Sequence, residues 1–144
     1  MKMAKLADPL TSVVVEIRYL ESLGQALQQR LSLVEAAIAE IQVASSTVGG
    51  LSKETAGADI LVPIGGGSYI RAKATDIEKL IVGVGADVAV EKSVKEAMES
   101  YEARLDELRK VRSSMGEELE RVGANLARAR QELQRLTSKR TEGT

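Results

Sequence analysis

Two heptad seams constrain the fold of this 144-residue chain more than any other feature. Within each seam, apolar residues recur at alternating spacings of three and four, which places them on one stripe of an α-helix that must pack against a partner helix. The first seam comprises Leu10, Val13, Ile17, Leu20, Gly24, Leu27, Leu31, Val34, Ile38, Ile41, Ser45 and Val48. The second comprises Val94, Met98, Tyr101, Leu105, Leu108, Arg112, Met115, Leu119, Val122, Leu126, Ala129, Leu133 and Leu136. Gly24 and Ser45 interrupt the first seam, and Arg112 is the one charged residue of the second. The seams predict two long helices that form a coiled coil.

The segment between the seams changes to patterns that are typical of β-hairpins. An apolar run from Ile60 to Ile64 is followed by three glycines and a second extended run, Ser68–Ala74. A second pair follows, with strands over 79–85 and 88–91 joined by a turn at Ala86-Asp87. Pro63 cannot donate a ladder hydrogen bond, so its strand is predicted to lie at an edge or to carry a bulge. The chain is therefore predicted to be an α+β protein.

Local signals mark the ends of both helices. Pro9 suits the first turn of a helix, and Gly49-Gly50 is predicted to end it. Ser93 and Glu96 have the spacing of a capping box at the start of the second helix. The predicted organisation is an N-terminal tip (1–9), a first helix (10–48), a linker (49–58), a two-hairpin module (59–92), a second helix (93–139) and a disordered tail (140–144).

The simplest arrangement folds the two helices back on each other as an antiparallel coiled coil. The hairpins then lie at the closed end and both chain termini at the open end. If Leu10 lies across from Leu136, the heptad spacing places Gly24 near Val122 and Ser45 near Tyr101. Small residues of the first seam then face larger residues of the second.

The hairpins are predicted to need other chains. Four short strands leave open edges and an apolar face, and a two-helix coil has no third layer to cover them. Closing the strands into a β-barrel with strands of other subunits removes those edges, so the module is predicted to drive oligomerisation. The residues expected to make this contact are Ile60, Val62, Ile64, Ile70, Ile81, Val82, Val84, Val88 and Val90.

Composition excludes several kinds of chemistry. The chain has no Cys and no His, only 2% aromatic residues and a formal net charge of −1. Thiolate or imidazole catalysis and Cys/His zinc sites are therefore excluded, and we expect no enzyme activity, no metal site and no cofactor. The Gly65–Ser68 run lacks the Gly-Lys-Ser/Thr ending of a phosphate-binding loop, which favours a plain hairpin turn. A neutral chain without aromatic stacking residues is a poor candidate for nucleic-acid binding.

We expect the protein to be soluble, because the most apolar window, Leu80–Val90, contains Asp87 and is far shorter than a membrane span. The open end of the coil is the predicted contact site for other proteins. Flexible apolar side chains gather there and can adapt to irregular surfaces. The candidates are Met1, Met3, Leu6, Leu10, Leu133 and Leu136, although the three leucines also have a simpler role in closing the coil.

The hairpin sequences add a family resemblance. A chain of helix, two hairpins and helix, with Ile60–Tyr69 reading Ile-Leu-Val-Pro-Ile-Gly-Gly-Gly-Ser-Tyr and a second hairpin over Val82–Lys92, resembles the alpha-class subunit of prefoldin. The resemblance implies a cytoplasmic hexamer of two alpha and four beta subunits joined through β-barrels. It also implies an ATP-independent chaperone that holds non-native proteins at the tips of its coils and passes them to a group II chaperonin. The filament-forming gamma class shares this subunit plan and is the alternative.

A basic bias near the open end suggests where a chaperonin binds. Residues 121–140 contain six basic side chains and one acidic side chain. The candidate contacts are Arg128, Arg130 and Arg135. A helix C-terminus also favours basic side chains through its dipole, so a plain solvated face is the competing interpretation.

Overall fold

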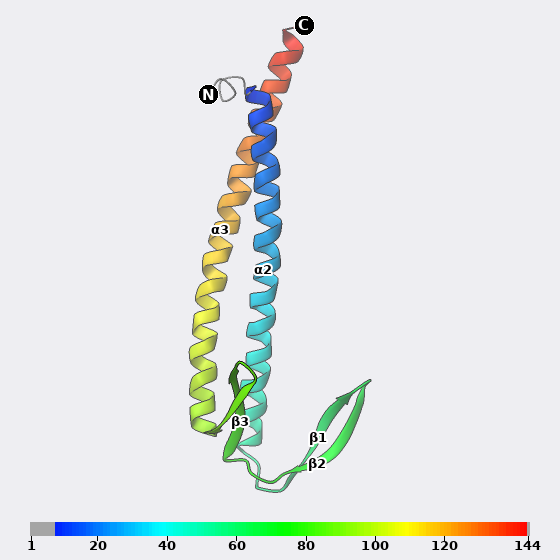
Figure 1. Cartoon of the computed structure of the whole chain (residues 1–144), viewed down its shortest axis with the longest axis vertical. Coiled ribbons are helices and arrows are strands. Elements are labelled where there is room, and N and C mark those ends of the chain that lie inside the picture. The colour runs from blue at the N-terminus through cyan, green and yellow to red at the C-terminus, as the bar shows by residue number, and fades with distance from the viewer. Residues whose placement is uncertain (1–7, 144) are drawn as a thin grey trace. The chain divides into compact units, whose positions relative to one another are not determined.

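The computed structural model describes residues 8–143 as two long helices separated by two β-hairpins (Figure 1). The elements, in chain order, are α2 (Pro9–Leu51), β1 (Ala58–Gly65), β2 (Ser68–Ala74), β3 (Lys79–Gly85), β4 (Val88–Ser93) and α3 (Val94–Glu142). This order confirms the predicted α+β organisation. The chain divides into two units, which are described separately below: the coil unit (Met1–Ala36 with Lys110–Thr144) and the hairpin unit (Ala37–Arg109).

The first helix begins with a side-chain cap. The Leu10 amide donates to Asp8 Oδ1 at 3.3 Å, and the Ser12 amide donates to the Asp8 carbonyl at 3.0 Å. Asp8 thus satisfies amides that have no partner within the first turn, and Pro9 occupies the position where a missing N–H does no harm.

The predicted end of this helix at Gly49-Gly50 was wrong by a few residues. Both glycines are helical, and α2 ends at Leu51. The Ser52 amide still donates to the Val48 carbonyl at 2.9 Å, and Ser52 Oγ donates to the Gly49 carbonyl at 2.9 Å. These bonds hold the last turn, although each glycine in a helix interior costs about 1 kcal/mol relative to alanine.

The second helix starts where the capping pattern placed it. The Glu96 amide donates to Ser93 Oγ at 3.1 Å. At the other end α3 runs to Glu142, so helix replaces part of the tail that was predicted to be disordered. The hydroxyls of Thr137 and Thr141 donate to the carbonyls of Leu133 and Thr137 at 2.8 and 2.9 Å, and these bonds lie along the extended part of α3.

In the coil unit, α2 and α3 run antiparallel and side by side (Figure 1). A Cβ placed on Gly24 would lie 3.6 Å from Val122 Cγ1, which confirms the predicted register. Arg130 and Glu21 form an ion pair between the helices at 3.1 Å. The core consists of seam residues from both helices: Leu20, Leu27, Val122 and Ala129, with Ile17, Leu23, Leu119 and Leu126 packed around them.

In the hairpin unit the ends of the two helices continue the seam. The seam residues Leu105 and Ile38 are each 4% exposed, and Ala97, beside the seam, is fully buried. Ser45 was predicted to lie near Tyr101; the contact made by its hydroxyl is with Met98 Sδ, at 3.9 Å, one helical turn before Tyr101.

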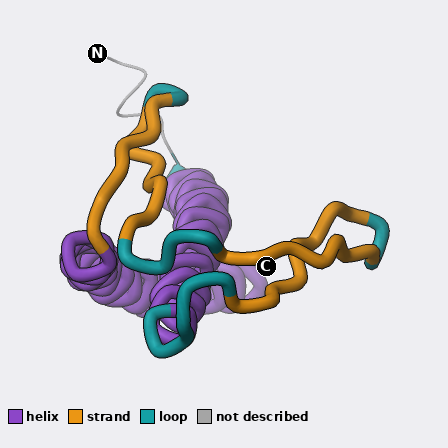
Figure 2. The backbone as a smooth tube through the Cα atoms, turned by 90° about the horizontal axis from the view of Figure 1, so that it is seen from below, coloured by secondary structure: helices purple, strands orange, loops and turns teal. Residues whose placement is uncertain are grey.

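Each hairpin is a separate two-stranded antiparallel sheet (Figure 2). Val62 pairs with Ile70 in the first hairpin, and Val82 pairs with Val90 in the second. Each hairpin also has a register shift close to its turn, and the one in β1 lies between Pro63 and Gly65, which confirms the predicted irregularity. The two hairpins thus share one plan, in which two antiparallel strands have a register shift near the turn.

Candidate functional sites: the hairpin surfaces and the open end of the coil

The predicted assembly residues lie on open surface. Ile81 is 82% exposed, and of the nine candidates only Ile60 and Val82 are half-buried. Exposed apolar side chains at this density are typical of a surface that other proteins cover. The seven exposed candidates are Val62, Ile64, Ile70, Ile81, Val84, Val88 and Val90.

Two further apolar side chains of the first hairpin were missed from the sequence. Leu61 and Tyr69 are 64% and 61% exposed. Leu61 pairs with Arg71 and Tyr69 with Pro63, so both residues belong to the face opposite Val62. Strand alternation places both residues on the face that also carries Arg71. Because a charged residue is typical of a solvent-exposed face, neither was included among the assembly candidates. The first hairpin therefore presents apolar groups on both faces.

The strand edges are also open. Each sheet contains two strands, so every strand has one edge whose N–H and C=O groups face no other strand of the described chain. Such edges pair readily with strands of other chains. The second hairpin borders a groove within its own unit, with β3 on one wall and Ile41, Ala44 and Tyr101 on the other. From the sequence, Ile41 and Tyr101 were assigned only to the coil seam.

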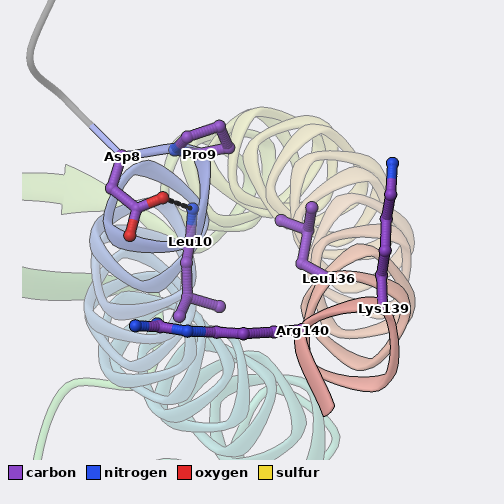
Figure 3. Close-up of a pocket in the computed structure, with 6 residues that line it drawn as sticks. All are labelled: Asp8, Pro9, Leu10, Leu136, Lys139 and Arg140. Atoms are coloured by element: carbon purple, nitrogen blue, oxygen red, sulfur yellow. Dashed lines mark hydrogen bonds between the residues drawn. The ribbon is translucent and has the colours of Figure 1, made fainter. Parts of the chain in front are cut away.

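The open end of the coil contains a shallow groove between the two helices (Figure 3). Leu10 of α2 and Leu136 of α3 line it, which confirms that these two residues lie across from each other. Asp8, Pro9, Lys139 and Arg140 complete the lining, and Figure 3 shows the Arg140 side chain extended from α3. Apolar carbon and positive charge therefore meet at this end.

The other predicted tip residues divide into two groups. Leu10, Leu133 and Leu136 are each half-buried, so each leucine both packs in the coil and keeps part of its surface accessible. Met1, Met3 and Leu6 lie outside the residues that the structure describes.

The three predicted chaperonin-contact arginines are not equivalent. Arg130 pairs with Glu21 on the other helix, and Arg135 Nε donates to Glu132 at 2.9 Å on the same helix. Hydrogen bonding from Arg135 lowers the pKa of the Glu132 carboxyl below its ordinary value. Arg128 makes no ion pair within residues 8–143. Of the three, Arg128 is therefore the one that can pair with an acidic group of another protein without first leaving an ion pair of its own.

The described part of the chain contains no cluster of three or more acidic, Cys or His side chains able to hold a metal ion. It does contain one helix, α2, that is long and apolar enough to cross a membrane by length and composition alone. The window predicted to be the most apolar from the sequence, Leu80–Val90, lies outside this helix. One such helix is weak support for a membrane span, since core helices of soluble proteins also meet these criteria.

The family model and the curated relatives that match this chain all belong to one family. The family model for the prefoldin subunit matches residues 20–139. The prefoldin subunit alpha of Pyrococcus horikoshii is 36% identical over 141 residues, which cover 94% of this chain and 95% of that protein. The prefoldin subunit alpha of Methanopyrus kandleri is 33% identical over 115 residues, covering 80% of this chain and 73% of that protein.

A solved structure supports the fold independently. The chain resembles a subunit of filamentous prefoldin from Methanocaldococcus jannaschii, determined by cryo-electron microscopy, with a TM-score of 0.68 and 21% identity, covering 78% of this chain and 93% of that one. At this identity the likeness supports the fold alone. The curated relatives carry the alpha-class name, so the filament-forming alternative is not favoured.

Proposed function

Because this chain belongs to the prefoldin family, in its alpha class, we propose that it is the subunit of an ATP-independent holdase that captures non-native proteins and transfers them to a group II chaperonin. Prefoldins are a family of chaperones that assemble with other prefoldin subunits. The proposed additions are the hexamer of two alpha and four beta subunits, capture at the open end of the coil, transfer to the chaperonin and a cytoplasmic location.

The exposed hairpins support the proposed assembly. Seven apolar candidates and the free strand edges are exposed among residues 8–143. Strands from beta subunits would extend each sheet and close it into a barrel, which removes the free edges and buries both faces of the first hairpin. The residues proposed to form this interface are those predicted from the sequence, together with Leu61 and Tyr69.

The observation that carries the proposed client capture is the groove at the open end. Leu10 and Leu136 face each other there with part of their surface accessible. A non-native segment would place an apolar side chain between them, and this contact requires neither a cofactor nor nucleotide hydrolysis. Met1, Met3, Leu6 and Leu133 are proposed to enlarge the contact.

The basic groups near the same end are proposed to bind the chaperonin. Arg128 has no ion pair within residues 8–143, and Lys139 and Arg140 line the open-end groove. Arg130 and Arg135 take part in this proposal more weakly, because each must leave an ion pair within the chain first. Contacts of this kind mainly raise the rate of association and weaken with salt.

Client capture is tested with the assembled hexamer and an aggregating client, without ATP. Replacing Leu10 and Leu136 with Gln should reduce the suppression of light scattering several-fold, because both walls of the groove become polar. Ala127→Gln is the matched control, since Ala127 is exposed on α3 away from the groove. Full protection by the double variant, with the hexamer intact, would contradict the proposed capture site.

Chaperonin transfer is tested by measuring affinity for an immobilised group II chaperonin at low and high salt. Replacing Arg128, Lys139 and Arg140 with Glu should weaken binding at low salt by tenfold or more and flatten its salt dependence. The same change at Arg121, which lies on α3 outside the groove, serves as the control. Equal loss from the control would mean that net charge alone governs binding.

A further inference from the structure

A hollow lies on one side of the coil unit, where a glycine of each helix meets the seam. Gly24 of α2 and Gly123 of α3 line it, and its volume is about 470 Å³, compared with about 370 Å³ for the open-end groove. The apolar part of its lining belongs to the coil core: Leu20, Leu119, Val122 and Leu126. Gly24 lies roughly 20 Å along the helix from Leu10. Apolar seam surface is therefore accessible a second time, away from the open end.

The packing of the coil requires neither glycine. A Cβ on Gly24 would make an ordinary contact with Val122 Cγ1, at 3.6 Å, and a Cβ on Gly123 would meet no atom of α2 within 4 Å. Neither glycine has a positive φ angle. Alanine would therefore fit at both positions and would stabilise the helices, because glycine is unfavourable in a helix interior. The two glycines thus leave open a space that the coil itself does not need.

The rim of this hollow is polar and carries no net charge. Gln25 and Gln28 line it, and each side-chain amide can both donate and accept hydrogen bonds. The two charged residues of the rim, Glu21 and Arg130, pair with each other at 3.1 Å. A phosphate or a free carboxylate would need an unpaired cation, whereas the N–H and C=O groups of a peptide backbone match the two amides. The rim therefore favours an uncharged polypeptide segment.

We propose that the hollow holds one apolar side chain of a non-native polypeptide, whose flanking backbone bonds to Gln25 and Gln28. This inference rests on the proposed client capture and adds a second site to it. The bound side chain leaves water for the apolar lining formed by Leu20 and Val122, so any client that exposes a leucine-sized group can bind. Once one site of a coil is occupied, binding at the other is intramolecular, and two weak contacts hold a client more tightly than either alone.

Methyl NMR of the assembled complex tests the inference. The probe is a short uncharged peptide, blocked at both ends, with a single central leucine among glycines and serines. The Val122 methyl signals should shift saturably as this peptide is added. The shift should be at least threefold smaller at the same concentration when alanine replaces the leucine of the peptide, because alanine buries less apolar surface.

The Leu10 methyl signals report on the open-end groove in the same titration. Movement of Leu10 without Val122 would overturn the inference and leave the proposed capture at the open end intact. Movement of Val122 without Leu10 would support the inference and count against the open-end site. Because this titration uses the wild-type chain, its outcome does not depend on how a variant folds.

Gly123→Leu should close the hollow, because a helical side chain leans over the preceding turn, which carries Leu119. This variant should lose the Val122 shift and suppress client aggregation at least twofold less well. It should nevertheless raise the melting temperature by about 2 to 4 °C, since a glycine leaves the helix interior. A gain in stability together with a loss of binding is not expected from a purely structural role.

Gly116→Leu is the matched control, because Gly116 has the same heptad position one repeat earlier and lies outside the hollow. It should raise the melting temperature as well, without changing the Val122 shift or the protection of clients. Equal loss of protection in both variants would overturn the inference. Disassembly of the Gly123→Leu complex in sedimentation velocity would overturn it in favour of another subunit as the occupant. A Val122 shift with phosphatidylcholine micelles but not with the peptide would overturn it in favour of a lipid.

Discussion

Similar aliphatic residues are buried in the coil unit and exposed in the hairpin unit. In the coil unit Leu27 and Val122 are 4% and 6% exposed, whereas Ile81 in the hairpin unit is 82% exposed. Two long helices supply each other with the second layer that an apolar stripe requires, and a two-stranded ribbon has no such layer. The difference indicates that the coil is stabilised within one chain, whereas the hairpins leave apolar surface that we propose is covered by other chains.

The largest expected effect is on the stability of the coil unit. Replacing Leu27 with Ala should lower the free energy of unfolding by about 2 to 5 kcal/mol, because a buried leucine leaves a cavity in the seam. Leu27 packs in the core cluster with Leu20, Val122 and Ala129. Thermal unfolding followed by circular dichroism at the helix minimum measures the change.

The same substitution in the hairpin unit is the control. Leu61 is 64% exposed, so Leu61→Ala should leave the unfolding midpoint of the isolated chain nearly unchanged. In the assembled complex, Leu61→Ala should become destabilising. If Leu61→Ala lowers the midpoint of the isolated chain as much as Leu27→Ala does, the contrast between the two units is wrong.

The next effect concerns assembly. Ile70 pairs with Val62 and is 53% exposed, so Ile70→Asp places a charge on the surface proposed to be buried between subunits. The buried unpaired carboxylate should weaken assembly at least tenfold and leave helix content unchanged. Sedimentation velocity measures the assembly state. Arg71→Asp, on the opposite face of the same strand, exchanges one charge for another and should weaken assembly less. An equal loss would mean that the negative charge, and not the loss of an apolar side chain, governs assembly.

The sequence predicted the coil in greater detail than the hairpins. The seam periodicity located both helices, and the alignment of Leu10 with Leu136 led to the observed approach of Gly24 and Val122. These predictions succeed because the heptad repeat fixes which residues face each other once one layer is known. Helix ends were less accurate, since Gly49 and Gly50 remain helical when the next turn supplies hydrogen bonds.

The functional surfaces were predicted only in part. Exposure of the hairpin residues follows from having two strands per sheet, but Leu61 was missed because Arg71 made its face look solvated. The arginines differ from one another in a way that the residue pattern did not show. All three were candidate chaperonin contacts, and Arg130 and Arg135 have acidic partners that are set by the helix register and by a spacing of three. Pairing between side chains depends on rotamers, which a residue pattern does not specify.

A smaller effect on stability is expected at the two hairpin turns. Gly65 and Gly85 have similar positive φ angles of 99° and 107°, and both turns continue with two residues of positive φ. In the first turn these two are glycines, whereas in the second Ala86 and Asp87 have φ of 52° and 58°. The left-handed region costs alanine about 1 kcal/mol relative to glycine, so Ala86→Gly should stabilise the second hairpin by about that amount.

Hydrogen exchange of the β3 and β4 amides measures this change. Gly66→Ala, with φ of 58°, is the reciprocal variant and should reduce protection in β1 and β2 by a similar factor. Faster exchange in the Ala86→Gly variant would show that entropy lost by the new glycine outweighs the relieved strain.

The ion pair across the coil should contribute little beside the seam. Glu21 and Arg130 are 48% and 59% exposed, and exposed pairs contribute about 0.2 to 1 kcal/mol. Glu21→Gln should therefore lower stability far less than Leu27→Ala does. A double-mutant cycle with Arg130→Gln isolates the pair, and the coupling should fall further at 1 M salt. A coupling as large as the Leu27→Ala effect would make charge, and not burial, the main stabiliser of the coil.

The smallest effect depends on pH. The hydrogen bond from Arg135 lowers the folded-state pKa of Glu132, so the pair stabilises the helix above the ordinary glutamate value of about 4.3 and loses that contribution as pH falls through the lowered pKa. Glu132→Gln removes the ionisable group. The difference in unfolding midpoint between wild type and Glu132→Gln should be constant near neutral pH and shrink only below the ordinary value. Glu120→Gln is the control, because Glu120 makes no ion pair within residues 8–143. A difference that instead grows as pH falls would mean that Glu132 is stabilising in its protonated form, which the hydrogen bond from Arg135 does not allow.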